Sequence, residues 1–164
     1  MYEGIFNMKA YSIKLIKDEI VHLSQPELVK LCLLLAKSKK ENKEYLSYLL
    51  FECEDEQRYV ESLKESLLQQ FEEVNVKSVY LTKKSLRKII RTAARFLKYT
   101  GNKESHVQIY LFLIREILKL KLNLTKSLAL QKIYTSLKNK LSNLIDELHE
   151  DLQFDYLSHF RKLD

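Results

Sequence analysis

The stretch SQPELVKLCLLLAKSKKENKEYLSYLLF, residues 24–51, predicts two helices folded back on each other and decides the fold expected for the whole chain. Ser24 and Glu27 have the spacing of a capping box, and Pro26 suits the first turn of a helix. A polar connector, residues 37–44, separates this helix from the second one. Because the connector contains neither Gly nor Pro, one continuous helix is the alternative.

The first of these two helices is apolar on nearly every side. Its apolar residues are Leu28, Leu31, Cys32 and Leu35 on one face at helical spacing, and Val29, Leu33 and Leu34 on the other sides. This pattern is typical of an interior helix, so we expect the rest of the chain to be organised around it. Cys32 and Cys53 both fall on apolar faces, which predicts reduced thiols in the core rather than a disulfide or a metal pair.

The composition is typical of a single all-α domain. The 164 residues include only 2 Gly and 1 Pro, on which tight turns and sheet corners usually depend, whereas 46% are hydrophobic and 30% are charged. We therefore expect residues 1–164 to form one all-helical domain of about seven helices. A regular αα-hairpin repeat and an irregular helical bundle both fit this composition.

Periodic apolar residues place the other helices. The expected ranges are 8–23, 55–74, 82–100, 102–122 and 125–148, with a short amphipathic segment at 154–160. Asp55 and Asn102 suit N-caps, and Gly101 can supply the left-handed residue that ends many helices. Residues 75–80 are expected to form a linker, and residues 1–7 a loose end.

A faint internal repeat relates residues 27–52 to residues 85–116. The matched pairs are Leu28 with Leu86, Lys30 with Lys88 and Ala36 with Ala94, and each segment contains Asn-Lys-Glu. Repetition of a helical hairpin predicts an α-solenoid or right-handed αα-superhelix, in which neighbouring hairpins bury each other's apolar faces. The alternative is chance similarity between two amphipathic hairpins rich in Leu and Lys.

The LCLLLAKSKKENKEYLSYLLF stretch and the repeated hairpin resemble small uncharacterised bacterial all-helical proteins and, more loosely, HEAT-type αα-hairpin repeats. The resemblance covers about half of the chain and implies a helical-repeat fold, but it carries over no functional residue. The chain lacks the Pro and the Asp/Arg pattern of HEAT hairpins, and its period is about 60 residues rather than about 40.

Nothing in the sequence indicates secretion or membrane insertion. The first residues, MYEGIFNMKAYSIKLIKDEI, lack the basic start, apolar run and small-residue cleavage site of a signal peptide. The longest uninterrupted apolar run, residues 31–36, is much shorter than the ~18 residues of a membrane span. We therefore expect a cytoplasmic protein with no membrane partner.

The net charge of +6 hides an uneven distribution. Residues 52–73 contain eight carboxylates and two bases, a net charge of −6, whereas residues 81–140 contain fifteen bases and two carboxylates, a net charge of +13. At about 100° per residue, six of these bases share an arc of about 100° along ~21 Å of the helix expected at 82–100. These six side chains form the basic ridge: Lys84, Arg87, Lys88, Arg91, Arg95 and Lys98.

The basic ridge is the candidate binding site. Like charges at these helical spacings cost about 0.2–0.5 kcal/mol per pair, and no carboxylate lies on the same helix to relieve them. The ridge can be a solvated face, or it can pair with the acidic segment 52–73, with an acidic protein, or with nucleic-acid phosphate while Tyr99 stacks on a base. We expect a non-catalytic helical-repeat scaffold that binds an anionic macromolecule here. The alternatives are a nucleic-acid-binding protein that uses the same ridge and, more distantly, a DNA-repair enzyme.

Sequence signals for catalysis are weak. With only 2 Gly the chain has no phosphate-binding loop, and it contains no nucleophile elbow, CxxC or nucleic-acid-binding signature. A repair enzyme would need an acidic catalytic residue among the bases, and none is evident. We therefore expect no enzyme activity and no cofactor. The oligomeric state cannot be inferred from the sequence.

Two patterns could hold a metal, but simpler explanations are available for both. Asp146 with His149, and Asp155 with His159, have spacings that place two ligands on one helical face, as ordinary surface neighbours also do. The carboxylates at 52–56 suit the start of a helix, where the helix dipole favours negative charge. The sequence therefore predicts no metal site.

Overall fold

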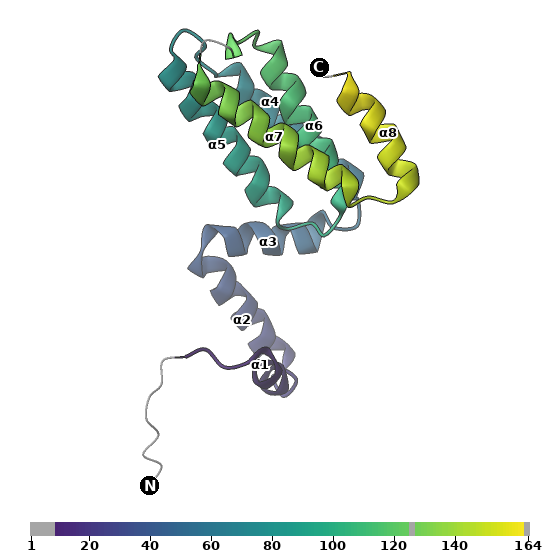
Figure 1. Ribbon diagram of the computed structural model, residues 1–164. Helices are drawn as coiled ribbons and strands as arrows, with labels where there is room; N and C mark the ends of the chain where they lie inside the picture. Colours follow the sequence, from purple (N-terminus) through teal and green to yellow (C-terminus); the bar gives the residue numbers. More distant parts are fainter. Residues whose placement is uncertain (1–8, 125–126, 163–164) are drawn as a thin grey trace. The chain divides into compact units, whose positions relative to one another are not determined.

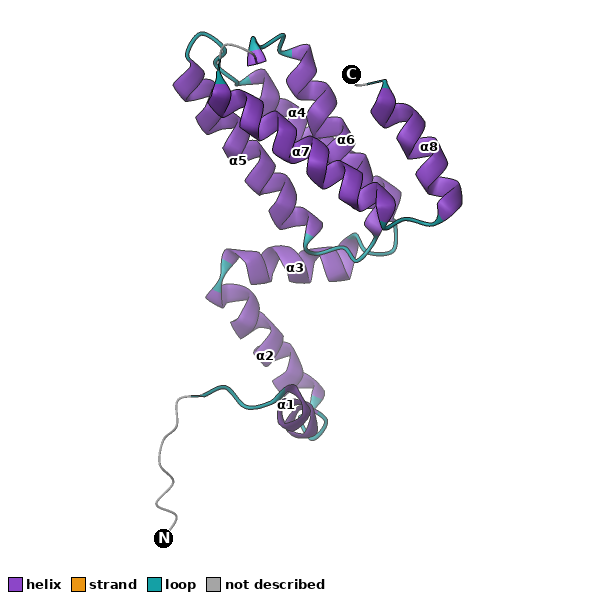
Figure 2. Cartoon of the chain, in the orientation of Figure 1, coloured by secondary structure: helices purple, strands orange, loops and turns teal. Residues whose placement is uncertain are grey.

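The structure is a computed structural model that describes residues 9–124 and 127–162 (Figure 1). Within those ranges the chain forms eight α-helices and no strand, which confirms the all-α prediction (Figure 2). The helices are α1 (Ile13–Ile20), α2 (Gln25–Ser38), α3 (Lys40–Phe51), α4 (Glu56–Glu72), α5 (Val79–Leu97), α6 (Lys103–Lys119), α7 (Leu128–Asp146) and α8 (Glu150–Arg161).

The chain divides into two compact units, residues 1–47 and residues 48–164. The N-terminal unit contains α1, α2 and the first part of α3. The C-terminal unit contains the end of α3 and the five helices α4 to α8. The expectation of a single domain over residues 1–164 stays a prediction.

In the N-terminal unit, the predicted helix start is confirmed, and so is a break between two helices. The predicted connector, residues 37–44, is wrong in its bounds, because α2 continues to Ser38 and α3 begins at Lys40. The Glu27 carboxylate accepts hydrogen bonds from the backbone N–H and the hydroxyl of Ser24, at 2.8 and 2.6 Å. The hydroxyl and then the amide of Ser24 lower the pKa of Glu27, since both bonds favour the ionised carboxylate. Lys39 has extended backbone angles, φ −147° and ψ 146°, so α2 and α3 are separate helices and the continuous-helix alternative is wrong.

The prediction that the apolar helix α2 is buried and central is wrong. No residue of α1 or α2 is buried, and Leu33 and Leu35 are each at least half exposed. Cys32 and Cys53 are both exposed, so the prediction of core thiols is wrong as well. The helix itself was predicted correctly, but the residues that were expected in the interior are exposed. The prediction of burial failed because burial depends on packing partners, which local periodicity does not identify.

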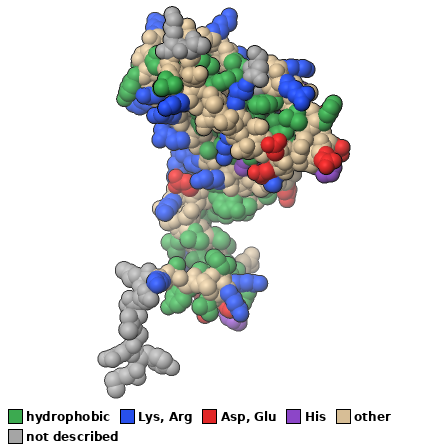
Figure 3. Space-filling model, viewed as in Figure 1, with side chains coloured by type: hydrophobic (Ala, Val, Ile, Leu, Met, Phe, Trp, Pro, Cys, Tyr) green, Lys and Arg blue, Asp and Glu red, His purple; other side chains and the backbone are tan. Residues whose placement is uncertain are grey.

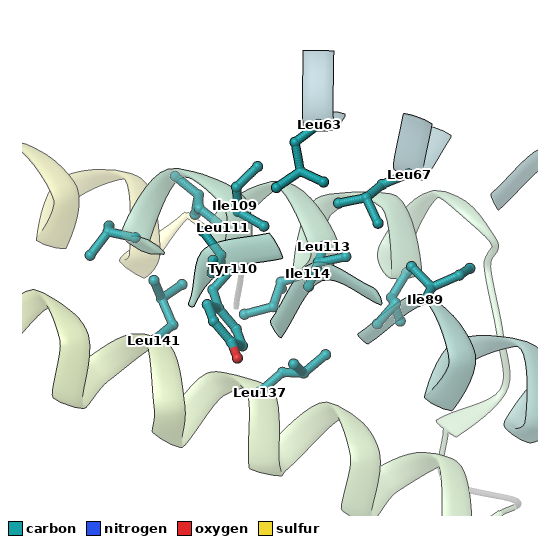
Figure 4. Close-up of a cluster of buried hydrophobic side chains, with 14 of the residues drawn as sticks. Leu63, Leu67, Ile89, Ile109, Tyr110, Leu111, Leu113, Ile114, Leu137 and Leu141 are labelled. Carbon is teal, nitrogen blue, oxygen red and sulfur yellow. The ribbon is translucent and has the colours of Figure 1, made fainter. Parts of the chain in front are cut away.

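The core of the C-terminal unit is built around α6 instead. This helix has buried side chains on several sides, and it packs against α4, α5 and α7. Figure 4 shows Ile109, Leu113 and Ile114 of α6 among side chains from the neighbouring helices. All three are fully buried, so α6 has the role that the sequence had suggested for α2.

The helices around α6 each contribute one apolar side. The buried residues of α4 include Leu63 and Leu67, and those of α7 include Leu137 and Leu141. Helix α8 has no fully buried residue and packs onto the core with partly buried side chains. These side chains are Leu152, Tyr156, Leu157 and Phe160. The amphipathic pattern that predicted these helices is therefore matched by the sides that they bury.

The helix ends agree with the sequence in part. Asp55 caps α4 by accepting a hydrogen bond from the Arg58 N–H at 3.0 Å, and Asn102 caps α6, so both cap predictions are confirmed. Gly101 does not have a positive φ; α5 ends at Leu97, four residues earlier, and the described residue with a positive φ is Lys121 at 49°.

The predicted linker at residues 75–80 was also placed too far along the chain. Ser78 caps α5, and the helix already begins at Val79. Helix α1 is shorter than the expected range 8–23, whereas α8 is longer than the expected range 154–160. The expected loose end at 1–7 and the start of the seventh helix at Thr125 lie outside the described residues.

Candidate anion-binding surface

Helix α5 separates its apolar and basic side chains onto opposite sides. Leu86, Ile89 and Ala93 are buried in the core of the C-terminal unit. At about 100° per residue, the six residues of the basic ridge share one arc of the helix, and this arc lies opposite the buried side. The side that anchors α5 therefore also fixes the direction in which the ridge faces.

Five of the six ridge residues are exposed: Lys84, Arg87, Lys88, Arg91 and Lys98. Arg95 is only partly exposed, and its guanidinium carbon lies 5.0 Å from the centre of the Phe96 ring. In Figure 3, Lys and Arg side chains follow the edge of the C-terminal unit along which α5 lies in Figure 1.

The carboxylates of α4 do not neutralise the exposed part of the ridge. Within the described ranges, none of these five cations has a carboxylate within 4.0 Å. The acidic helix uses its carboxylates locally: Glu61 pairs with Lys64 at 2.8 Å, and Glu56 accepts bonds from hydroxyl groups. Intramolecular pairing with residues 52–73, one of the alternatives for the ridge, is not found for these five side chains.

The exposed ridge borders a shallow depression of about 510 Å³. Its lining residues are Tyr80, Lys83, Lys84, Arg87, Ile90 and Arg91 of α5. Tyr80 is 65% exposed, and the Lys83 ammonium lies 5.6 Å from the centre of its ring. Tyr99, which was expected to be available for stacking, is partly exposed, and its ring packs edge-on against Phe96 at 5.9 Å. The aromatic ring that lines this depression is that of Tyr80.

The basic surface continues from α5 onto α7. A second depression of about 270 Å³ lies between the two helices and is lined by Arg87 and Ile90 of α5 and by Lys132 and Ser136 of α7, among others. A third, of about 390 Å³, is lined by α7 residues that include Lys132, Ser136 and Asn139. Arg87 and Ile90 border both the first and the second depression, and Lys132 and Ser136 border both the second and the third. The three depressions therefore adjoin one another, and together we term them the α5–α7 groove.

The side chains of the α5–α7 groove suit a phosphate-bearing ligand. The described lining residues include cations, amides and hydroxyls, all of which can donate hydrogen bonds to phosphate, and none of them is acidic. Sequence reasoning found the α5 side of this groove but missed Lys132 and Ser136. The 3.6-residue period groups residues of one helix, but it does not indicate which side of α7 borders α5.

A second polar cluster, at the start of α4 and α6, was also missed. The Oε1 atom of Glu56 accepts hydrogen bonds from Ser105 at 2.5 Å and Thr100 at 2.7 Å, and its Oε2 atom accepts one from Tyr48 at 3.0 Å. The three hydroxyl-bearing residues are all buried. Burial, and then the Glu56 carboxylate, raise the pKa of Tyr48.

This Glu56 cluster fastens segments together rather than presenting a reactive group. It joins α4, the α5–α6 connection and the first turn of α6 through bonds in which the carboxylate is the common acceptor. Buried polar groups in stable proteins form hydrogen bonds, and the buried hydroxyls of Tyr48, Thr100 and Ser105 all donate one to Glu56. The sequence predicted that an acidic residue at position 56 suits the start of a helix, which explains where Glu56 lies. It did not predict the contacts of Glu56 with these hydroxyls.

The histidine and acidic pairs do not assemble a metal centre. Among the described residues there is no group of three or more His, Cys, Asp or Glu side chains that could hold a metal ion. His149 lies 3.4 Å from Asp151 at an exposed helix start, rather than beside Asp146 as the metal pattern would require. These residues therefore provide no support for metal chemistry.

Comparisons of the chain with protein-family models, with curated proteins and with solved structures find no match. None of the described helices combines the length and the apolar character needed to cross a membrane.

Proposed function

We propose that this protein is a non-catalytic, all-helical binding protein that holds an anionic macromolecule on the basic ridge. The observation that supports this proposal is the set of five exposed cations on one side of α5, none of which has a carboxylate partner among the described residues. Their mutual repulsion favours any ligand that places negative charge along the helix.

The scaffold and its setting are part of the same proposal. We take the all-helical chain to be a hairpin-repeat scaffold of the loosely HEAT-like kind, acting in the cytoplasm. The α5–α7 groove lacks an acidic side chain among its described lining residues, which supports a binding role over a repair-type enzyme that would need a catalytic carboxylate there.

Two classes of anionic partner remain, and the groove favours nucleic acid over an acidic protein. A phosphate backbone needs cations at regular intervals together with hydrogen-bond donors, and the groove offers Arg87 and Lys132 beside Ser136. Between Lys84 and Lys98 the ridge extends ~21 Å, enough to follow several phosphates of one strand. The exposed ring of Tyr80 can stack on a base at the edge of the groove.

The test is the affinity of the protein for single-stranded RNA, duplex DNA and polyglutamate, measured by fluorescence anisotropy as salt is raised. A ligand held by phosphate contacts should lose affinity steeply, with a slope of about −0.7 to −0.9 in log–log units for each contact. Binding of RNA or DNA with this slope supports the nucleic-acid candidate. Binding of polyglutamate alone supports an acidic protein, and binding of none of the three at low salt contradicts the proposal.

The matched variants separate a specific ridge from general charge. Arg87→Glu with Arg91→Glu reverses two exposed ridge cations, and we expect at least tenfold weaker binding with an unchanged circular dichroism spectrum. Arg115→Glu with Arg161→Glu makes the same change in net charge at exposed residues outside the groove, and should weaken binding much less. Equal losses from both pairs would mean that net charge, not the ridge, binds the ligand.

A further inference from the structure

Tyr80 lies on the same side of α5 as the basic ridge. At about 100° per residue it falls within the arc of the ridge, about one turn before Lys84 and about 10 Å along the helix axis from Arg87. Its side chain is 65% exposed, so most of the ring is open to a ligand. An aromatic ring therefore begins the line of cations on α5, although phosphate charge alone requires no ring.

The depression beside Tyr80 has an apolar part and a charged part. Its volume is about 510 Å³, and Tyr80 and the partly buried Ile90 form the apolar part. Lys84, Arg87 and Arg91 line much of the rest. Ligand pockets of roughly 300–1,000 Å³ commonly combine apolar and aromatic walls with a few polar groups that orient the ligand. A nucleobase against the ring, with its phosphate toward the cations, fits this division.

We infer that the α5–α7 groove takes single-stranded nucleic acid, with one unpaired base stacked on Tyr80 and the flanking phosphates held by the basic ridge. This inference rests on the proposed function and names the form of nucleic acid that the groove accepts. Aromatic side chains beside a basic groove are a common means of binding single strands, because every base has a flat face that can stack. In a duplex, both faces of an internal base are already stacked on neighbouring bases, so the ring of Tyr80 would have no partner.

The width of the surface also disfavours a duplex. Helices α5 and α7 pack against each other, and both border the second depression, through Arg87 and Lys132 (Figure 1). Two helices of ~10 Å diameter whose axes are ~8 Å apart are together about 18 Å wide. The major groove of B-DNA is ~12 Å wide and admits one helix. The α5–α7 surface is therefore too wide to enter the groove of a duplex, whereas a flexible strand can lie along the boundary between the two helices.

The α7 side of the groove offers further contacts to the sugar–phosphate backbone. Lys132 is exposed, and within the part of the chain that the structure describes it has no carboxylate within 4.0 Å. Ser136 and Asn139, one and two turns further along α7, are exposed hydrogen-bond donors that line the third depression. A strand that crosses Arg87 from Tyr80 therefore meets a second row of donors, so stacking and phosphate contacts act on the same ligand.

The first test compares strands that differ in their bases. Fluorescence anisotropy measures the affinity of the full chain for oligothymidylate and oligouridylate of about 12 nucleotides and for an abasic strand with the same number of phosphates. We expect the two base-bearing strands to bind at least about fivefold more tightly than the abasic strand. Equal affinity for all three overturns the inference and still supports the proposed function, whereas binding of none of them at low salt contradicts both.

The second test removes the ring. Tyr80→Ala should weaken binding of oligothymidylate at least about fivefold with an unchanged circular dichroism spectrum, because the side chain is exposed and the buried side of α5 is untouched. Its affinity for the abasic strand and for duplex DNA should change less than about twofold, and the slope of affinity against salt should stay the same, since the phosphate contacts remain. Tyr80→Phe keeps the ring and should bind as the wild type does.

The matched control is a second exposed tyrosine outside the groove. Tyr11 is 77% exposed in the N-terminal unit, and Tyr11→Ala should leave the affinity for oligothymidylate unchanged. A Tyr80→Ala chain that binds oligothymidylate as the wild type does overturns the inference, and so does one that loses affinity equally for oligothymidylate, the abasic strand and the duplex. Both results leave the proposed function standing, because the wild-type chain still binds nucleic acid.

Discussion

Helices α2 and α6 are both apolar on more than one side, yet they have opposite environments. Helix α6 buries nine residues, and Leu113 and Ile114 have no exposed surface at all. Helix α2 buries none, and Leu34 is 57% exposed. The difference does not come from helix formation, since both helices are well capped at their starts.

The contrast comes from the number of neighbouring helices in each unit. Helix α6 is packed against α4, α5 and α7, so each of its apolar sides meets another apolar side. Among residues 9–47, the described part of the N-terminal unit, the other helices are α1 and the first part of α3. A helix that is apolar on all sides therefore needs packing partners on all sides. The rest of the fold determines whether those partners are present.

The same Leu→Ala substitution in the two helices should give the largest difference. Leu113→Ala removes a fully buried side chain from α6 and should lower the free energy of unfolding by about 2–5 kcal/mol. Leu34→Ala removes an exposed side chain and introduces a good helix former, so we expect a change within about 0.5 kcal/mol. Urea denaturation followed by circular dichroism measures both.

A large loss for Leu34→Ala at a concentration where the chain is monomeric would show that α2 is covered within one chain. The contrast between the two helices would then be lost. Leu34 is the suitable position because it is 57% exposed, so a loss of packing within its own unit is not expected.

Most of the local structure could be predicted from the sequence. Asp55 and Asn102 were identified as caps because an Asp or Asn before an apolar run satisfies free N–H groups, which is a local effect. Gly101 was assigned a left-handed conformation that it does not have, because a glycine after a helix permits that conformation without requiring it. The position of the core could not be predicted, since apolar periodicity in α2 and in α6 predicts burial equally.

The candidate site was predictable on one helix only. Lys84, Arg87 and Arg91 were grouped correctly on one side of α5, because the helical period alone determines that grouping. Lys132 and Ser136 lie 41 or more residues beyond Arg91 in the sequence, and they border the same groove only because α5 and α7 pack together. Contacts between distant segments need the fold, and a single sequence does not provide it.

The Glu56 cluster should give the next largest effect, because it fastens the buried helix α6 to its neighbours. Glu56→Ala would leave the hydroxyls of Ser105, which is 2% exposed, and of Thr100 without their acceptor. We expect a loss of about 1–3 kcal/mol in the free energy of unfolding, the cost of an unpaired buried polar group. Thermal and urea denaturation measure the loss.

The control for this prediction lies on the same helix. Glu61→Ala removes an exposed carboxylate that pairs with the partly buried Lys64 and accepts a hydrogen bond from the exposed Gln57, and it should cost less than about 1 kcal/mol. Glu56→Ala combined with Ser105→Ala should cost less than the sum of the two single substitutions, because the second removes a group that the first left unpaired. Strict additivity would show that the two side chains do not interact.

Helix α8 is intermediate between α6 and α2, since it packs on the core through one partly buried side. The Tyr156 hydroxyl donates a hydrogen bond to Oε1 of Glu104 on α6 at 2.8 Å. Tyr156→Phe keeps the ring and removes this bond, so we expect a loss of about 1 kcal/mol. Leu157→Ala, a change in the same partly buried side, should loosen α8 by lost packing rather than by a lost hydrogen bond.

The pH dependence of this contact gives the smallest and most specific effect. Burial, and then the hydrogen bond to Glu104, raise the pKa of Tyr156 from 10 to about 12. Below pH 10 the tyrosine is protonated in both states and stability is unaffected. Between pH 10 and about 12 the unfolded chain loses the proton and the folded chain keeps it, so stability falls as pH rises. The Tyr156→Phe protein should lack this part of the decline in stability. The difference in tyrosinate absorbance between the two proteins should have its midpoint near pH 12. A midpoint near pH 10 would show that Tyr156 is exposed to water, as Leu34 of α2 is.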